Sequence, residues 1–340
     1  MKFVRYSSIE NSYREKFIDK VVYEGHSDGE WSVTEKIHGS NFAFYVQEGL
    51  NKSIEIRCAK RSGFIDDGEN FFNYQVVLER YRDAITSLFN DNRQGLDGPI
   101  VSMSIHGELF GGHYPHKDIN KSQYKAIQKG VFYSNNVEFV AFDVKINTIL
   151  QNTKVLEKLE EYGIPTLKPI YRGTMDECLA YRNSFQTTIP AILGLPEIEN
   201  NICEGVVIKP NNPRFLYDRT RVIIKNKNEK FKEIQQESKH KNRTPKKEVE
   251  LTEDAAILKT KIPTYCNENR LNNLISKMGE LKPSDFGKIM KELNQDAIED
   301  FVKDTEKVFN RLDKKEQKIL TKLFGSYNSS IIKAYFRGNV

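Results

Sequence analysis

The stretch WSVTEKIHGSNFAFYV, residues 31–46, consists of two β-like runs that meet at a glycine. Five more runs of this kind precede residue 228: SIEIRCAK (53–60), PIVSMSIHGELF (99–110), VEFVAFDVKI (137–146), GVVIKP (205–210) and RVIIKNK (221–227). Many alternate apolar with polar residues and end at Gly, Asn or Pro, which is typical of half-buried antiparallel strands. Apolar residues at three- and four-residue spacing predict helices at 74–89 and 152–162. We therefore expect an α+β domain over residues 1–235.

The composition changes after this domain. Residues 225–250 hold nine Lys or Arg against five Asp or Glu, a surplus of four, and we expect a basic linker at 236–249. Such a strip can neutralise nucleic-acid phosphates, but a solvated linker of mixed charge is an equal alternative. Beyond it we expect an all-helical domain over 250–340, with Ser284 as the N-cap of one helix. The apolar stripes that predict its helices lie at 271–278, 286–293, 298–312, 319–324 and 331–336.

The whole chain has the balance of a globular protein. Its 340 residues allow two domains, and 38% of them are apolar and 29% charged. No stretch approaches the roughly 20 apolar residues that span a bilayer. The N-terminal residues contain no apolar run of signal-peptide length, so we expect an intracellular protein, in the cytoplasm or in a host cytoplasm. Four cysteines without a CxxC pair argue against both a zinc site and a disulfide framework, and we expect ordinary thiols.

Six short clusters suggest chemistry. In chain order they are EKIHG (35–39), AKRSG (59–63), HGELFGG (106–112), FVAFD (139–143), EGVVIKP (204–210) and IIKNK (223–227). Each is weak evidence alone, because a lysine, a glycine and a pair of carboxylates occur in most chains of this length. Their ordered coincidence indicates a nucleotidyl-transferring site built around Lys36.

A lysine amine is a nucleophile only when it is neutral, and nearby cations or burial must lower its ordinary pKa of roughly 10.4. Lys225 and Lys227 stand two residues apart, so strand alternation places both on one face. If that face meets Lys36, they could assist it and also hold an α-phosphate. The same alternation places Lys209 on the face opposite Glu204, and we assign it no chemistry. Taken singly, Lys36 would be interpreted as a surface lysine and IIKNK as a fraying strand end.

At these residues the chain resembles a known family. Lys36, with Gly39 three residues later, matches the KxxG motif of nucleotidyltransferases, and the ordered clusters resemble the double-stranded RNA ligase family of phage-type RNA ligase 2 enzymes. Kinetoplastid RNA-editing ligases are relatives of this family. The similarity runs from YSSIENSY (6–13) to RLNNLISKMGELKPSDFGKIM (270–290). It implies a nucleotidyltransferase domain, an ATP-grasp-like ligase domain of antiparallel sheets with helices, followed by a small all-helical C-terminal domain.

The resemblance also implies an activity in RNA repair. Lys36 would attack the α-phosphorus of ATP, release pyrophosphate and hold AMP as a lysyl adduct, with Mg²⁺ or Mn²⁺ present. A 5′-phosphate at a nick would then take the AMP, and the neighbouring 3′-hydroxyl would displace it. The implied partner is nicked double-stranded RNA, or an RNA/DNA hybrid, and the implied protein is a monomer.

Positions that match the family motifs carry its roles over to this chain. In the family these positions contact adenine (Glu35), handle pyrophosphate (His38), engage the nick (Asn41), bind phosphate (Arg61), hold the ribose (Glu108), stack on adenine (Phe142) and associate with metal (Glu204). An arginine fork suits two phosphate oxygens, and hard divalent cations prefer oxygen ligands. Without the resemblance, Arg61 would be interpreted as a surface ion pair and Phe142 as a core side chain.

Three alternatives can be weighed on the sequence. DNA ligases and capping guanylyltransferases usually carry KxDG, whereas this chain has His38 in place of the aspartate, and they append a β-barrel where this chain is expected to be helical. The third alternative is a protein that binds nucleic acid but has lost turnover. Every expected catalytic position is occupied by the expected residue, which favours an active ligase.

Overall fold

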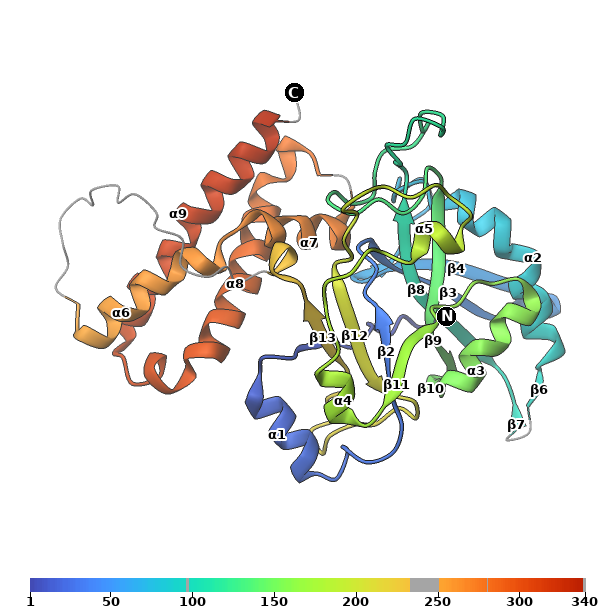
Figure 1. Cartoon of the computed structure of the whole chain (residues 1–340), viewed down its shortest axis with the longest axis horizontal. Coiled ribbons are helices and arrows are strands. Elements are labelled where there is room, and N and C mark those ends of the chain that lie inside the picture. The colour runs from blue at the N-terminus through green and yellow to red at the C-terminus, as the bar shows by residue number, and fades with distance from the viewer. Residues whose placement is uncertain (96–97, 233–250, 280, 339–340) are drawn as a thin grey trace. The chain divides into compact units, whose positions relative to one another are not determined.

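The computed structural model describes residues 1–95, 98–232, 251–279 and 281–338 and divides into two compact units, Met1–Lys230 and Phe231–Val340 (Figure 1). The expected basic linker at 236–249 lies outside the described residues. Among these residues, no helix is long and apolar enough to cross a membrane. All four cysteines are free thiols, as expected.

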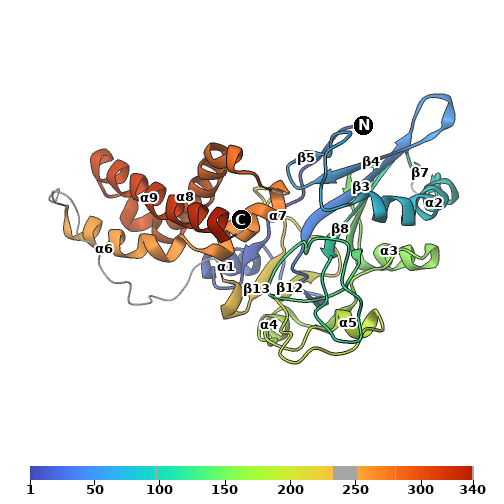
Figure 2. The same cartoon turned by 90° about the horizontal axis from the view of Figure 1, so that it is seen from above.

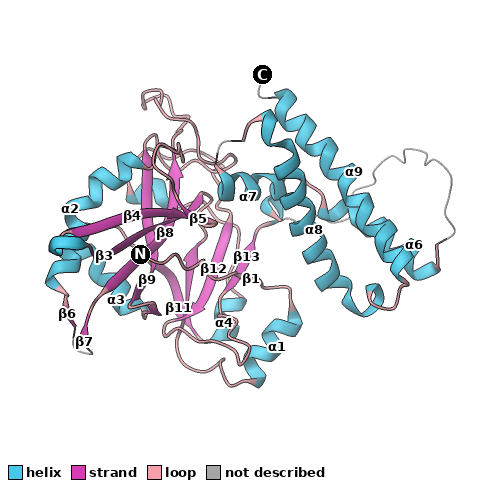
Figure 3. Ribbon diagram, turned by 180° about the vertical axis from the view of Figure 1, so that it is seen from behind, coloured by secondary structure: helices cyan, strands magenta, loops and turns pink. Residues whose placement is uncertain are grey.

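Two sheets form the body of the first unit (Figure 3). The five-stranded sheet has the order β1 (Glu10–Asn11), β13 (Ile224–Lys227), β12 (Gly205–Pro210), β2 (Trp31–Glu35) and β11 (Pro169–Gly173). The six-stranded sheet has the order β10 (Ile149–Leu150), β9 (Val137–Ile146), β8 (Ser102–Gly111), β3 (Ser40–Glu48), β4 (Ile54–Lys60) and β5 (Gly63–Phe64). A short hairpin, β6 (Gln94–Gly95) and β7 (Gly98–Pro99), stands apart. Each predicted β-like run contains a strand, and pairing within both sheets is antiparallel except between β1 and β13.

Helices cover the outer face of each sheet. Val21 of α1 (Glu15–Tyr23) and Met175 of α4 (Met175–Leu179) pack with Trp31 and Ile208 of the five-stranded sheet. On the other sheet lie α2 (Gln75–Asp91) and the α3 (Thr153–Glu157) and 3₁₀ (Lys158–Tyr162) pair, which confirm the two predicted helices (Figure 2). Burying one apolar side chain such as Val21 or Met175 stabilises the fold by about 1.5–3 kcal/mol. The short α5 (Ile189–Ile192) follows the loop after α4.

The inner faces of the two sheets carry the polar side chains. Val206 and Ile208 belong to the outer core, so alternation along β12 points Val207 and Lys209 inward. Val207 pairs with Lys225, and Gly205 with Lys227. Both lysines therefore share one face, as predicted, and the structure shows that it is the inner face. Opposite them, β9 supplies Asp143, whose carboxylate accepts a hydrogen bond of 2.8 Å from Lys209. The space between the sheets is therefore where charged groups meet.

One prediction from alternation is wrong. Glu204 and Lys209 both reach the inner side, although they stand five residues apart. The reason is Gly205, whose φ of +145° interrupts the strand geometry directly after Glu204. A Cβ at this position would lie 2.2 Å from the Asn226 carbonyl oxygen, so the turn requires glycine.

The second unit is helical, as predicted. It contains α6 (Glu253–Lys261), α7 (Glu268–Met278), α8 (Phe286–Phe309) and α9 (Lys314–Gly338), with 3₁₀ turns at Ile262–Tyr265 and Pro283–Asp285. The stripes 286–293 and 298–312 belong mainly to the single helix α8, and the last two stripes to α9. The predicted N-cap at Ser284 is wrong, because Ser284 lies inside the 3₁₀ turn. Asp285 instead accepts a 2.9 Å hydrogen bond from the Lys282 backbone N–H.

Candidate active site

Lys36 is the first residue after β2, at the C-terminal end of this strand of the five-stranded sheet. Its backbone N–H donates to the Gly205 carbonyl at 2.9 Å, which ties this residue to the start of β12. Three residues on, Gly39 comes so close to β8 that a Cβ would lie 2.3 Å from the Leu109 carbonyl oxygen. The glycine of the KxxG motif is therefore needed to bring the lysine loop against the six-stranded sheet.

Glu204 is the centre of a cluster of cationic groups. The Lys36 Nζ lies 2.8 Å from its Oε2, the Lys227 Nζ lies 2.9 Å from its Oε1, and the His38 Nδ1 lies 3.2 Å from its Oε2. Burial opposes ionisation of Glu204, which is 1% exposed, but the charges around it hold its pKa well below the usual range. Lys225 lies half-buried on the same face, two residues before Lys227. Four of the predicted residues, Lys36, His38, Glu204 and Lys227, are thus brought into direct contact.

Glu108 forms the opposite wall of this site. Removal from water raises the pKa of Glu108 to about 8, and Lys36 and Arg61 are close enough to counteract part of that increase. Arg61 lies in the turn between β4 and β5, and Asn41 pairs with Glu108 across the ladder of β3 and β8. Two carboxyl groups, Glu108 and Glu204, therefore face a site that also contains Lys36, Arg61 and Lys227.

Glu35 lies next to the nucleophile position, but its carboxylate is turned to a different part of the molecule. The Thr187 hydroxyl donates to Oε1, while the Thr188 backbone N–H and hydroxyl both donate to Oε2 at 2.8 Å. Burial raises the pKa of Glu35 above its ordinary value, although these hydrogen bonds offset part of the increase. A further buried residue, Tyr133, accepts a hydrogen bond of 2.9 Å from the His38 backbone N–H.

Phe142 lies in a neighbouring buried cluster. Its ring packs against the Tyr6 ring, with centroids 5.2 Å apart, and its carbonyl accepts a hydrogen bond of 2.7 Å from the Lys209 Nζ. Asp143 receives hydrogen bonds from Tyr6, from Lys209 and, at 2.6 and 3.0 Å, from both Nη atoms of Arg221. Burial opposes the charge on Asp143, but Arg221 and Lys209 hold its pKa far below the usual range. This cluster fixes the backbone at the predicted base-stacking residue.

Sequence reasoning missed several residues that shape the site. Tyr6 lies in the stretch YSSIENSY (6–13) and Asp143 in the cluster FVAFD (139–143), so the sequence motifs include both residues. The motifs do not indicate which side chains these two residues contact. Tyr133, Thr187 and Thr188 lie in loops that carry no periodic pattern. Lys209 and Arg221 stand at the ends of predicted strands without any sequence feature that pairs them with Asp143.

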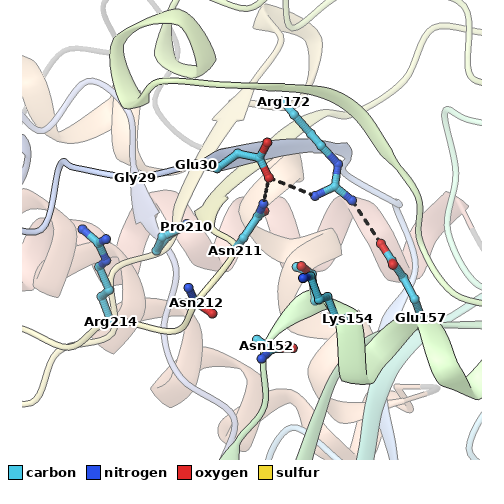
Figure 4. Close-up of a pocket in the computed structure, with 11 residues that line it drawn as sticks. Gly29, Glu30, Asn152, Lys154, Glu157, Arg172, Pro210, Asn211, Asn212 and Arg214 are labelled. Atoms are coloured by element: carbon cyan, nitrogen blue, oxygen red, sulfur yellow. Dashed lines mark hydrogen bonds and ion pairs between the residues drawn. The ribbon is translucent and has the colours of Figure 1, made fainter.

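A separate polar pocket lies at the far ends of β2 and β12 (Figure 4). Its volume is about 500 Å³, and Lys154 and Arg214 are among its lining residues. Arg172 is held between two carboxylates, 3.5 Å from Glu30 and 3.0 Å from Glu157. None of the predicted catalytic residues lines this pocket, so it is distinct from the cluster around Glu204.

The donor set limits how a metal ion could be held. Within the described ranges, no three His, Cys, Asp or Glu side chains are grouped so that they could bind one. Glu204 could supply a single carboxylate ligand, and hard cations such as Mg²⁺ commonly combine one or two carboxylates with substrate phosphates and water. The residues present fit a cation that is held jointly by Glu204 and a nucleotide.

Lys36 thus stands at a strand end, in contact with the buried carboxylate of Glu204. Residues 29–227 match the family model described as RNA ligase, and residues 249–327 match the one described as T4 RNA ligase 2 C-terminal. The chain belongs to the RNA ligase family. The predicted fold class and the predicted class of enzyme, an ATP-dependent RNA ligase, are thereby confirmed.

Curated relatives agree with this family. The chain is 29% identical over 356 residues to the mitochondrial RNA-editing ligase 2 of Trypanosoma brucei brucei, covering 89% of this chain and 84% of that protein. It is also 29% identical over 351 residues to RNA-editing ligase 1 of the same organism, covering 86% and 74%.

Solved structures are more distant. The Naegleria gruberi RNA ligase with PPi is 16% identical, with a TM-score of 0.42, and covers 67% of this chain and 56% of that one. An archaeal ATP-dependent RNA ligase is 11% identical, with a TM-score of 0.38, and covers 90% and 66%.

Proposed function

We propose that this chain seals 3′-hydroxyl/5′-phosphate nicks in duplex RNA, with Lys36 as the nucleophile that carries AMP. The observation that supports it most directly is the contact of Lys36 with Glu204, itself held by Lys227 and His38. RNA-editing ligases are among the relatives, and their names also indicate RNA as the substrate.

In the first step the Lys36 amine attacks the α-phosphorus of ATP. A nitrogen–phosphorus bond forms, the bond to the pyrophosphate oxygen breaks, and the amine loses its proton. Lys225 and Lys227 lie on the inner face where they can neutralise the phosphate charge, and Arg61 can bind two phosphate oxygens at once. The protein's contribution is mainly position and charge, as in other phosphoryl transfers.

Glu204 keeps the Lys36 side chain in place before the reaction. The Lys36 Nζ lies 2.8 Å from the Glu204 Oε2, and this contact must loosen before Lys36 can attack. A divalent cation at Glu204 would neutralise phosphate charge and compete with Lys36 for that carboxylate. Glu204 would thus serve as the partner of Lys36 in the resting enzyme and could supply a carboxylate ligand to a divalent cation in the loaded enzyme.

The remaining roles are proposed from the resemblance of the matched positions to the family motifs. Glu108 accepts hydrogen bonds from the ribose, Phe142 stacks on adenine, Glu35 borders the adenine site, His38 handles pyrophosphate and Asn41 engages the nick. The RNA 5′-phosphate then takes the AMP from Lys36, and the 3′-hydroxyl of the neighbouring nucleotide displaces AMP to close the strand. The helical unit is expected to bind the duplex, whose recognition depends on shape and phosphates.

The test is incubation with α-labelled ATP, and in parallel α-labelled GTP, with Mg²⁺ or Mn²⁺, followed by denaturing electrophoresis. We expect a labelled band from ATP alone, lost in Lys36→Ala and retained in Lys154→Ala, which removes a lysine of the separate pocket. A labelled Lys36→Ala protein would place the nucleophile elsewhere. Label from GTP would favour a capping enzyme, and no label from nucleotide-stripped protein would favour a binding protein without turnover.

Duplex specificity needs its own test. We expect removal of residues 250–340 to spare the labelled adduct and to impair sealing of a nicked RNA duplex. Equal sealing of the nick by the truncated and the full chain would contradict the role of the helical unit.

A further inference from the structure

The loop between α4 and α5 contains a segment, residues 183–188, that lies against the functional strand ends. The ladders of the sheet stop where the site begins: the last pair between β12 and β2 is Val206 with Glu35, and the last between β12 and β13 is Gly205 with Lys227. The nucleophile position and Glu204 therefore lie at or just beyond the last paired residues. Two backbone hydrogen bonds continue past these pairs, from Lys36 to Gly205 at 2.9 Å and from Asn228 to Glu204 at 3.0 Å. The 183–188 segment adds further hydrogen bonds to the same ends.

The 183–188 segment bonds to two of these ends through its first part. The Asn183 Nδ2 donates to the Lys227 carbonyl at 3.0 Å and to the Asn226 Oδ1 at 2.9 Å. The Cys203 N–H, one residue before Glu204, donates to the Phe185 carbonyl at 3.0 Å. One loop thus fixes the chain on both sides of the Glu204 and Lys227 pair.

The last part of the segment bonds to the third end. Thr187 and Thr188 donate three hydrogen bonds to the Glu35 carboxylate, which is 1% exposed. The Thr187 N–H also donates to the Asn201 carbonyl at 2.9 Å. Because Lys36 is the next residue after Glu35, the anchored carboxylate limits how far the nucleophile can move.

We infer that Thr187 and Thr188, with Asn183, are positioning residues that hold the ends of β2, β12 and β13 so that Lys36, Glu204 and Lys227 meet. The inference rests on the proposed function of Lys36. None of the three side chains need touch the nucleotide, since each acts through Glu35 or Lys227. Displacement of reacting groups by about 1 Å can cost roughly a hundredfold in rate, so a loosened anchor affects the first step.

Paired substitutions separate the hydroxyl from the shape of the side chain. Thr187→Val and Thr188→Val keep the shape and lose the hydroxyl donor, whereas Thr187→Ser and Thr188→Ser keep the donor and lose a methyl group. A role in packing would make the serine variants the worse ones. A role in anchoring Glu35 makes the valine variants the worse ones.

The experiment measures single-turnover formation of the labelled adduct over a range of ATP concentrations in the full chain. We expect each valine variant to lower the maximal rate at least about tenfold with a change in KM below about threefold, and each serine variant to stay within about threefold of wild type. Thr252→Val is the matched control, because the Thr252 N–H and hydroxyl both donate to the Glu316 Oε1 at 2.8 Å in the helical unit. Its rate of adduct formation should be unchanged.

Folded valine variants with wild-type rates would overturn the inference, and so would serine variants that fail as badly as valine variants. If a valine variant does not fold, Asn183→Ala decides, since it removes the bonds to Asn226 and Lys227 and should show the same fall in maximal rate. A wild-type protein that forms no adduct at all would instead refute the proposed function.

Discussion

The substitution Asp143→Asn should destabilise the first unit strongly. Asp143 is buried and accepts hydrogen bonds from Tyr6, Lys209 and Arg221. Asparagine has the same size but no charge, so two buried cations lose their shared counter-ion. Removing one partner of a buried ion pair typically costs about 3–5 kcal/mol, out of a total stability of about 5–15 kcal/mol.

The effect has a defined pH dependence. The folded pKa of Asp143 lies below its unfolded value, so its contribution to stability is fully present above the unfolded pKa and is lost as the pH falls through the folded pKa. Since an unfolded aspartate titrates near pH 3.9, the difference between wild type and Asp143→Asn should be largest at pH 6–8 and shrink below about pH 4.

Urea unfolding followed by tryptophan fluorescence measures this difference. Trp31 is the chain's one tryptophan and is buried in the outer core of the five-stranded sheet, so its emission reports on the first unit. With a slope of about 2–3 kcal/mol per molar urea, the midpoint should fall by about 1–2.5 M. Asp218→Asn, which removes an exposed partner of Lys20, should leave the midpoint unchanged. If the urea midpoint of Asp143→Asn fell by less than about 0.5 M, the buried charge of Asp143 would not contribute to stability as the structure indicates.

Three further substitutions test other parts of the site. Gly205→Ala should abolish adduct formation and lower the urea midpoint, because the φ of Gly205 is +145° and an added Cβ would clash with the Asn226 carbonyl oxygen. Gly25→Ala is the control: Gly25 has a φ of +72° but open space around it, so this variant should cost about 1 kcal/mol, and equal effects of the two variants would refute the steric argument. Glu108→Gln should raise the free energy of unfolding at pH 8 by about 1–3 kcal/mol, because a carboxyl group whose pKa is raised in the folded state destabilises the protein above its unfolded pKa. Urea midpoints measured at pH 4 and pH 8 should therefore show the gain only at pH 8. Lys227→Ala should lower the rate of adduct formation at least about a hundredfold, measured with labelled ATP, while an unchanged rate would remove Lys227 from the first step.

The strands and the cluster around Glu204 could be predicted largely because both follow from local sequence patterns. Lys36, Glu108 and Glu204 each stand on or beside a β-like run, so strand prediction also placed the chemistry on the sheet. The strand β11 (Pro169–Gly173) was not predicted, because it is a short edge strand that carries Pro and Gly at its ends. The helical stripes on either side of Gly325 join in α9, although glycine often ends a helix. A Cβ at Gly325 would lie 3.8 Å from the Asn294 Nδ2 and 4.0 Å from the Met290 Cε of α8, which are ordinary contact distances, so the helix does not require glycine here.

The residues that sequence reasoning missed depend on tertiary contacts. Asp143 and Arg221 are 78 residues apart, and Thr188 and Glu35 are 153 apart. Threonines in a loop and a tyrosine in the long connection between β8 and β9 have no spacing that would indicate a partner. The contacts of such residues can be identified only from the folded structure, in which segments distant in the sequence lie together.

The position of Glu204 shows why a correct pattern can still give a wrong face. Alternation is a property of extended backbone, and it holds from Val206 to Lys209. Val206 and Ile208 point to the outer side, and Val207 and Lys209 to the inner side. It fails at one residue, because Gly205 takes a backbone conformation that a side chain rarely adopts. That single departure turns Glu204 toward Lys36 and Lys227, so the contact on which the proposed chemistry depends exists because the strand pattern is broken there. A glycine directly after a carboxylate at the start of a buried strand is therefore a position where alternation should not be extended backward.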